Sequence, residues 1–177
     1  NKTSSIVPRK AIQELIRLLD STEDVRAEIG ANNICLTFND LSFITKLIDG
    51  KFPDYNRVIP TNTEINIQLN SQALKPSLQR VSILANEKFR GIRLETTGSS
   101  LNLSSENPEQ EQANETIPLQ EKVKKIVVGF NVSYLIDAVS SCDGNAVCLS
   151  LNDENSSALI TSPEDKNTKY VVMPMRL

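Results

Sequence analysis

The stretch Ile34-Cys-Leu-Thr-Phe-Asn-Asp40 closely matches a second stretch, Val147-Cys-Leu-Ser-Leu-Asn-Asp153. Each follows an amphipathic helical pattern and leads through Asn-Asp into a second strand-like run. Cys35 and Cys148, which hold the same place in the two stretches, lie 113 residues apart. This period is near the length of one domain, so it predicts tandem copies of one fold, a partial copy followed by a whole one.

Three segments have the periodicity of amphipathic helices. Apolar residues at i, i+3, i+4 and i+7 predict helices over residues 8–19, 71–84 and 131–140. The second of these helices starts at Ser71 or as late as Lys75. Pro8 suits the first turn of the first helix, because a missing N–H costs nothing there. Pro76 favours a second helix that begins close to it.

Alternating runs between these helices are typical of antiparallel hairpins. Asn, Asp, Gly or Ser turns join three pairs of runs: 34–38 with 41–48, 91–96 with 100–104, and 146–151 with 156–161. The predicted fold class is therefore α+β with mostly antiparallel strands.

Composition excludes several kinds of catalytic site. The chain has no histidine, which removes the commonest general base and the commonest zinc ligand. Neither a Ser-His-Asp nor a Cys-His site can be built from it. Three cysteines without a CxxC pair fit small buried residues in a reducing compartment. With no P-loop, GxGxxG or GxSxG string either, an enzyme is disfavoured, and a hydrolase that works through carboxylates is the form that stays open. We expect no metal or cofactor.

Charge and hydropathy limit the partners. The net charge is −3 and the pI is about 5.1, which argues against a uniformly basic nucleic-acid binder but allows a local basic surface. The sequence has no apolar run of transmembrane length, and the first ten residues have no apolar core of a signal peptide. A cytoplasmic location is expected.

The last eight residues, Tyr170-Val-Val-Met-Pro-Met-Arg-Leu177, are mostly apolar. Two interpretations remain open for them. They form a final strand tucked into the core, or they form an apolar groove in which methionines adapt to varied guests.

Four strings, in this order and spacing, resemble those of one family. They are Lys51-Phe-Pro-Asp-Tyr55, Asn86-Glu-Lys-Phe-Arg-Gly91, Gly129-Phe-Asn-Val-Ser-Tyr134 and the terminal eight residues. Together they closely resemble the bacterial DNA polymerase III beta subunit family, the sliding clamps. The resemblance implies the DNA clamp fold: tandem pseudo-repeated domains with antiparallel sheets outside and pore-lining helices inside. Residues 1–60 would be the second half of the middle domain, and 61–177 the complete third domain.

The resemblance also implies a function. Clamp subunits form a homodimer ring that encircles duplex DNA without sequence specificity, and they act as non-catalytic processivity factors in the bacterial cytoplasm. An apolar cleft would bind short peptides of the Gln-x-x-Leu-Phe type from the DNA polymerase III alpha subunit, the clamp loader and other proteins with a clamp-binding motif. Because the family's first domain has no counterpart here, we expect this chain alone not to close the usual ring. The alternative is a peptide-binding adaptor domain unrelated to DNA, with the same groove and no ring.

The resemblance assigns candidate residues to three surfaces. The partner-peptide cleft would contain Pro53, Arg57, Val58, Asn131, Tyr134, Ser157, Val171, Met173, Pro174 and Met175. The DNA-facing residues would be Arg9, Lys10, Lys75 and Arg80, which would contact phosphates without reading bases. The ring interface would contain Ile83, Leu84, Glu109, Glu111 and Glu115.

Overall fold

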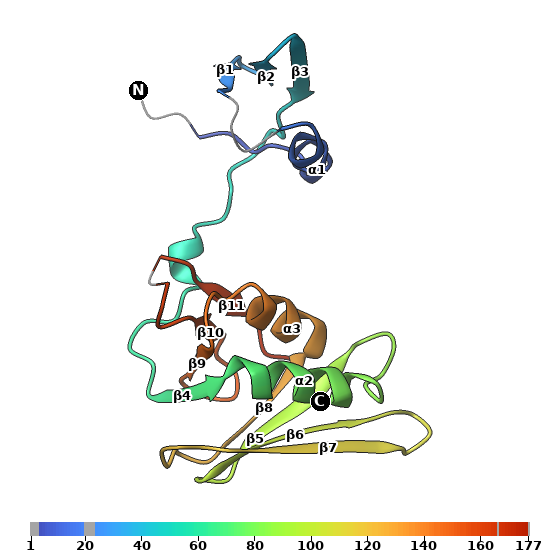
Figure 1. Ribbon diagram of the computed structural model, residues 1–177, viewed down its shortest axis with the longest axis vertical. Coiled ribbons are helices and arrows are strands. Elements are labelled where there is room, and N and C mark those ends of the chain that lie inside the picture. The colour runs from blue at the N-terminus through green and yellow to red at the C-terminus, as the bar shows by residue number, and fades with distance from the viewer. Residues whose placement is uncertain (1–3, 20–23, 166, 177) are drawn as a thin grey trace. The chain divides into compact units, whose positions relative to one another are not determined.

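The computed structural model describes residues 4–19, 24–165 and 167–176 (Figure 1). The chain divides into two compact units, Asn1–Asp54 (unit 1) and Tyr55–Leu177 (unit 2).

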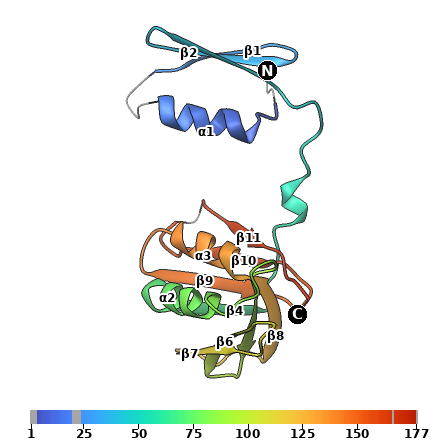
Figure 2. The same ribbon diagram turned by 90° about the vertical axis from the view of Figure 1, so that its right-hand side faces the viewer.

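Unit 1 contains one helix and one three-stranded antiparallel sheet of order β1-β2-β3. Its elements are α1 (Arg9–Leu18), β1 (Arg26–Ile29), β2 (Asn33–Phe38) and β3 (Leu41–Lys46). The helix runs along one face of the sheet (Figure 2) and buries Ala11 and Leu15, which lie one turn apart. An isolated antiparallel bridge joins Ile6, before the helix, to Ile48, after the sheet.

Unit 2 consists of two halves with the same order of elements, strand, helix and three strands. A short 3-10 helix, η1 (Tyr55–Arg57), precedes them. The first half is β4 (Ile65–Asn70), α2 (Ser71–Ser82), β5 (Gly91–Thr96), β6 (Ser100–Glu106) and β7 (Gln112–Pro118). The second half is β8 (Ile126–Asn131), α3 (Val132–Ser140), β9 (Ala146–Leu151), β10 (Ala158–Thr161) and β11 (Tyr170–Val172).

The two halves of unit 2 exchange their first strands. One sheet has the order β11-β10-β9-β4 and the other β7-β6-β5-β8. Each sheet therefore holds the three last strands of one half and the first strand of the other, and all pairs are antiparallel. Helices α2 and α3 pack against each other, and one continuous apolar core fills the unit.

Both helices of unit 2 start at an asparagine that ends the preceding strand. The side chain of Asn70 accepts hydrogen bonds from the backbone N–H groups of Gln72 and Ala73, at 2.8 and 3.3 Å. Asn131 accepts one from Ser133 at 2.9 Å. These caps satisfy N–H groups that have no partner within the helix. The second helix thus starts at residue 71 and passes through Pro76, although the sequence favoured a start nearer the proline.

The tandem arrangement is confirmed, but the matched stretches that suggested it are not equivalent. Residues 34–40 lie on β2, the second strand after α1, whereas 147–153 lie on β9, the first strand after α3. The prediction skipped β1, whose four residues are all exposed and show no alternation. Helices α1 and α3 begin at Arg9 and Val132, so the structural period is 123 residues rather than 113.

The core of unit 2 yields a stability prediction. Leu78 on α2 is fully buried, so the Leu78→Ala variant should lose about 2–5 kcal/mol of unfolding free energy through lost burial and the cavity left behind. Urea unfolding followed by tyrosine fluorescence measures this, because all three tyrosines lie in unit 2. The exposed neighbour Ile83 provides the control: Ile83→Ala should change stability by less than about 0.5 kcal/mol. Equal losses in the two variants would contradict this packing.

Candidate functional site

The terminal segment joins the two sheets of unit 2. Val171 pairs with Leu159 of β10, and Val172 is buried. Farther along, the backbone N–H of Met175 donates to the carbonyl oxygen of Gly129 on β8, at 2.9 Å. The segment is therefore a strand in the core up to residue 172 and an accessible stretch beyond it. The guest-binding groove stays a prediction. Leu177 lies outside the described residues.

Seven of the ten predicted cleft residues lie in unit 2, on the terminal segment and on elements beside it, and we call these seven the tail patch. Met173 and Tyr134 are 60% and 61% exposed. The Ser157 hydroxyl donates to the sulfur of Met173, at 2.9 Å, and so fixes the side chain of this methionine. The members are Asn131 and Tyr134 at the start of α3, Ser157 before β10, Val171 on β11, and Met173, Pro174 and Met175 beyond it.

Asn131 has a structural role at the tail patch. While its oxygen caps α3, its amide nitrogen donates to the carbonyl oxygen of Phe89, at 3.2 Å. Phe89 belongs to the loop between α2 and β5, whose turn is closed by a 2.7 Å bond from the Arg90 N–H to the Asn86 carbonyl oxygen. Asn131 thus ties this loop to the start of α3.

A cavity of about 600 Å³ lies beside the tail patch and shares Met175 with it. Part of its lining comes from the string 86–91, one of the four strings that carry the family resemblance, but no role was predicted for the cavity. Its lining residues are Asn86, Phe89, Gly91, Arg93, Ser104, Ser105, Glu106, Gln112, Asn114, Met175 and Arg176. Most of these side chains are polar, and Phe89 and Met175 are the large apolar ones among them.

The other three predicted cleft residues lie far from the tail patch in the sequence. Arg57 ends η1 and Val58 follows it, and both are exposed. Pro53 is also exposed and belongs to unit 1. Their membership of a common cleft with the tail patch stays a prediction.

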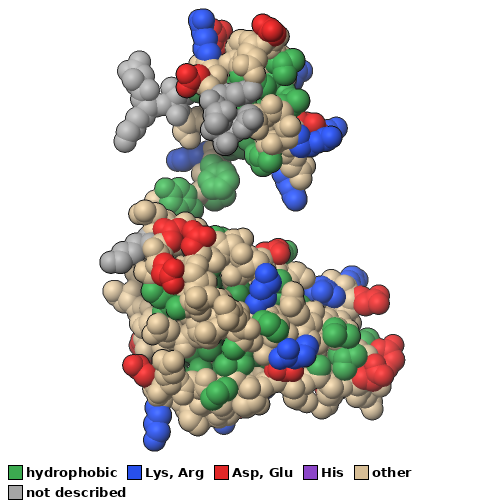
Figure 3. Space-filling model, in the orientation of Figure 1, with side chains coloured by type: hydrophobic (Ala, Val, Ile, Leu, Met, Phe, Trp, Pro, Cys, Tyr) green, Lys and Arg blue, Asp and Glu red, His purple; other side chains and the backbone are tan. Residues whose placement is uncertain are grey.

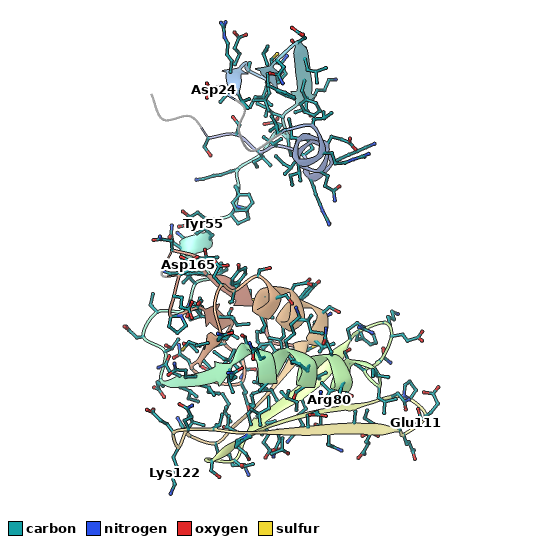
Figure 4. All side chains as sticks on the ribbon, viewed as in Figure 1. Asp24, Tyr55, Arg80, Glu111, Lys122 and Asp165 are labelled. Atoms are coloured by element: carbon teal, nitrogen blue, oxygen red, sulfur yellow. The ribbon has the colours of Figure 1, made fainter. Side chains whose placement is uncertain are left out.

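Arg80 and Glu115, predicted for different surfaces, bind each other. In Figure 4 the Arg80 label lies between α2 and β7, and its guanidinium donates two bonds of 2.7 Å to the two carboxylate oxygens of Glu115. The Ser77 hydroxyl donates to the same carboxylate, at 3.1 Å. These bonds, above all those from Arg80, hold the pKa of Glu115 below its ordinary value. The same pair raises the pKa of Arg80.

The remaining candidates for DNA contact lie on helices of both units. Arg9 and Lys10 form the first turn of α1 and are exposed. Lys75 lies on α2 and is half-buried. All three lie on helical surfaces, as the clamp resemblance expects of residues that face DNA, and their contact with DNA stays a prediction.

The predicted interface residues lie around the last turn of α2 and the β6–β7 hairpin. Ile83 and Leu84 directly follow α2, whose end is held to β6 by a 2.6 Å bond from the Ser105 hydroxyl to the Val81 carbonyl oxygen. Glu111 accepts a 2.7 Å bond from the side chain of Asn107 in the turn. Glu109 is exposed in the same turn. Figure 3 shows acidic side chains gathered at this end of unit 2.

The described residues provide little for other chemistry. Within them, no three or more His, Cys, Asp or Glu side chains come together in a way that could hold a metal ion. Cys35, Cys142 and Cys148 are free and half-buried. No helix in the described part is both long and apolar enough to span a bilayer.

The Arg80–Glu115 ion pair predicts that the unfolding free energy of unit 2 depends on pH. Because the pKa of Glu115 is lowered by folding, its contribution to stability is present above the unfolded-state pKa and disappears as the pH falls through the lower folded-state pKa. Glu115→Gln should therefore destabilise unit 2 at neutral pH, and the difference from the unchanged protein should vanish in acid. Urea unfolding at a series of pH values measures this.

Two variants serve as controls for that prediction. Arg80→Gln should return the pKa of Glu115 toward its ordinary value in a carboxyl NMR titration. Glu109→Gln, in the neighbouring turn, should leave the stability unchanged. A Glu115 pKa that does not respond to Arg80→Gln would show that the ion pair is not formed in solution.

Comparisons with known proteins agree over nearly the whole chain. Residues 56–176 match the family model for the C-terminal domain of the DNA polymerase III beta subunit, and residues 1–54 match that for its central domain. The beta sliding clamp of Escherichia coli K12 is 42% identical over 175 residues, which cover 98% of this chain and 48% of that protein. The beta sliding clamp of Vibrio cholerae is 41% identical over 173 residues, 97% of this chain and 47% of that protein.

Solved structures give the same result. The DNA polymerase III subunit beta of Pseudomonas aeruginosa matches with a TM-score of 0.91 at 42% identity, over 98% of this chain and 48% of that one. The Caulobacter crescentus pol III beta matches with a TM-score of 0.90 at 30% identity, over 98% of this chain and 46% of that one. The chain thus spans about half the length of the relatives it matches. With two family models and the clamp fold both matched, the chain belongs to the DNA polymerase III beta subunit family, the bacterial sliding clamps.

Proposed function

We propose that the chain is part of a replication processivity clamp that encircles duplex DNA without sequence specificity and tethers the replicative polymerase through a peptide-binding cleft. Family membership over residues 1–54 and 56–176 carries this proposal. In it, residues 1–60 are the second half of the middle domain and 61–177 the third domain. The parent protein acts in the bacterial cytoplasm as a non-catalytic homodimer.

The tail patch supports the peptide-binding part of the proposal. Its exposed apolar side chains lie on a backbone that is held at both ends, by β10 on one side and by Gly129 on the other. Such a pre-formed surface loses little conformational entropy on binding. Apolar side chains of a guest peptide would cover Met173 and Tyr134, while Ser157 and Asn131 offer polar groups that fix its register. The polymerase alpha subunit, the clamp loader and other proteins with a clamp-binding motif are the proposed guests.

The helices support the DNA-binding part. Exposed Arg9 and Lys10 on α1 and the amine of Lys75 on α2 are suited to sequence-independent phosphate contact. Arg80 contributes differently, because its guanidinium already binds Glu115. We propose that it contacts phosphate only through donors that Glu115 does not occupy, because the carboxylate compensates its charge.

An edge strand supports the ring interface. Among the described strands β7 pairs only with β6, so its other edge is open. An open edge is a natural place for pairing with another subunit. Ile83 and Leu84 would add apolar contact beside it, and the glutamates 109, 111 and 115 would meet basic partner residues. Exposed ion pairs contribute little, so the apolar pair should dominate.

The family assignment decides against the alternative. A peptide-binding adaptor unrelated to DNA would share the groove, but this chain belongs to the clamp family over both of its units.

The tail patch predicts a measurable loss of affinity. Met173→Ala should weaken the binding of a fluorescent Gln-x-x-Leu-Phe peptide by roughly tenfold, because the peptide loses apolar surface to cover. Fluorescence anisotropy titration of the chain measures this. The matched control is Ile83→Ala, an exposed apolar residue outside the patch, which should bind as the unchanged chain does. Saturable binding that is equal in all three proteins would place the peptide elsewhere.

The helices predict a salt-dependent interaction with DNA. Replacing Arg9 and Lys10 together by glutamine should lower the slope of log affinity against log salt for duplex DNA by roughly one per lost phosphate contact, whatever the DNA sequence. Titration of labelled duplexes of unrelated sequence at several salt concentrations measures this. A slope that does not change would exclude these two residues from the DNA surface.

A further inference from the structure

The sheet β7-β6-β5-β8 of unit 2 has a row of residues that crosses all four strands. Arg93 on β5 is paired with Gly129 of β8 on one side and with Ser104 of β6 on the other. Ser104 is paired in turn with Asn114 of β7. Residues directly opposite each other lie on the same face of a sheet. Both neighbours of Arg93 on β5 are buried in the core, so the row lies on the outer face.

Two glycines leave this outer face hollow. Gly129 belongs to the row itself, and Gly91 lies two residues before Arg93 on β5, hence on the same face. A glycine in a strand often marks a place where a ligand or another backbone comes close. The backbone N–H of Met175 comes close to the first, since it donates to the Gly129 carbonyl oxygen, and Gly91 lines the cavity of about 600 Å³.

Two arginines provide the positive charge of this cavity. Arg93 and Arg176 both line it, and both are exposed. The Nε atom of Arg93 lies 3.7 Å from one carboxylate oxygen of Glu95, which is too far for a hydrogen bond. The other oxygen of that carboxylate lies 3.6 Å from the amine of Lys125. The N–H donors of the Arg93 guanidinium therefore remain for another acceptor.

The described lining of the cavity contains one carboxylate, that of Glu106. One of its oxygens accepts a 3.2 Å bond from the side-chain amide of Gln112. Two guanidinium groups and one carboxylate thus line the cavity, and this balance favours an anionic guest. Guanidinium groups bind carboxylates through two parallel hydrogen bonds, as Arg80 already does with Glu115 elsewhere in unit 2.

The cavity adjoins the tail patch at a distance that a peptide can span. Met175 belongs to both, and it is bridged to Gly129, which is paired with Arg93. Neighbouring chains of a sheet lie about 4.8 Å apart, so the backbones of Met175 and Arg93 are separated by about 10 Å. An extended peptide advances about 3.3 Å per residue, so a side chain roughly two to four residues beyond the part that covers Met175 reaches Arg93.

We propose that this cavity binds acidic residues that flank the clamp-binding motif of the guest peptide. The proposal rests on the peptide-binding function of the tail patch. While the motif covers Met173 and Tyr134, a carboxylate outside the motif accepts hydrogen bonds from Arg93 and Arg176. A peptide lies on the patch in one direction, so only one of its flanks reaches the cavity. The cavity thus selects among partners that share the motif and differ in the charge of that flank.

Fluorescence anisotropy titrations of the chain with three peptides test this proposal. All three peptides contain Gln-x-x-Leu-Phe; one has uncharged flanks, one has two glutamates on the N-terminal side, and one has two on the C-terminal side. One acidic peptide should bind roughly three- to tenfold more tightly than the uncharged peptide, because it gains charge-assisted hydrogen bonds. The other acidic peptide should show no gain. In the Arg93→Gln variant the ratio of the two affinities should fall to about one.

Lys122→Gln is the matched control. It removes one positive charge from an exposed residue in the loop after β7 (Figure 4), whereas the cavity lies at the other end of β7, beside Gln112. This variant should keep the preference for the acidic flank.

The uncharged peptide separates the two possible failures. If it does not bind, the peptide-binding function of the tail patch fails, and this proposal fails with it. If it binds and neither acidic flank brings a gain, the flank-binding cavity alone is overturned. The same holds if both flanks bring an equal gain, or if the gain persists in Arg93→Gln.

Discussion

The exchange of first strands between the two halves of unit 2 is the constraint on which the rest depends. Neither half can complete a four-stranded sheet alone, since β4 belongs to the sheet of the second half and β8 to that of the first. Because each exchanged strand leads directly into a helix through a capping asparagine, the strand pairing also brings α2 against α3. One core then serves both halves, and burial of that apolar surface stabilises the whole unit.

The proposed peptide-binding surface follows from the position of β8. One edge of this strand pairs with β5, and the other receives the N–H of Met175 from the end of the chain. The residue that ends β8, Asn131, caps α3 and holds the loop at Phe89. A single strand therefore positions the start of α3, the terminal segment and the neighbouring loop. The tail patch is formed by backbone contacts within unit 2, and its side chains remain available to a partner.

Local patterns in the sequence predicted local structure well. All three helices and three of the hairpins, β2–β3, β5–β6 and β9–β10, were predicted, with ends a few residues off, whereas β1 and β7 were not predicted as strands. Two further strands were not predicted. They are β4 (Ile65–Asn70), whose residues alternate between buried and exposed, and β8 (Ile126–Asn131), which is mostly buried. Both pair with strands that are not their neighbours in sequence, so no turn marks them. Arg80 and Glu115 show the same limit: each was assigned to a separate surface, and only the fold brings these residues, 35 positions apart, into one ion pair.

The central claim is that the end of the chain forms a peptide-binding surface. The chain has only two methionines, Met173 and Met175, so a sample labelled at the methionine methyl groups gives two resonances that report on this surface directly. Titration with a Gln-x-x-Leu-Phe peptide should shift both resonances along one saturation curve, and a scrambled peptide should shift neither. Saturable binding that leaves both methyl resonances in place, or no binding at all, would contradict the account.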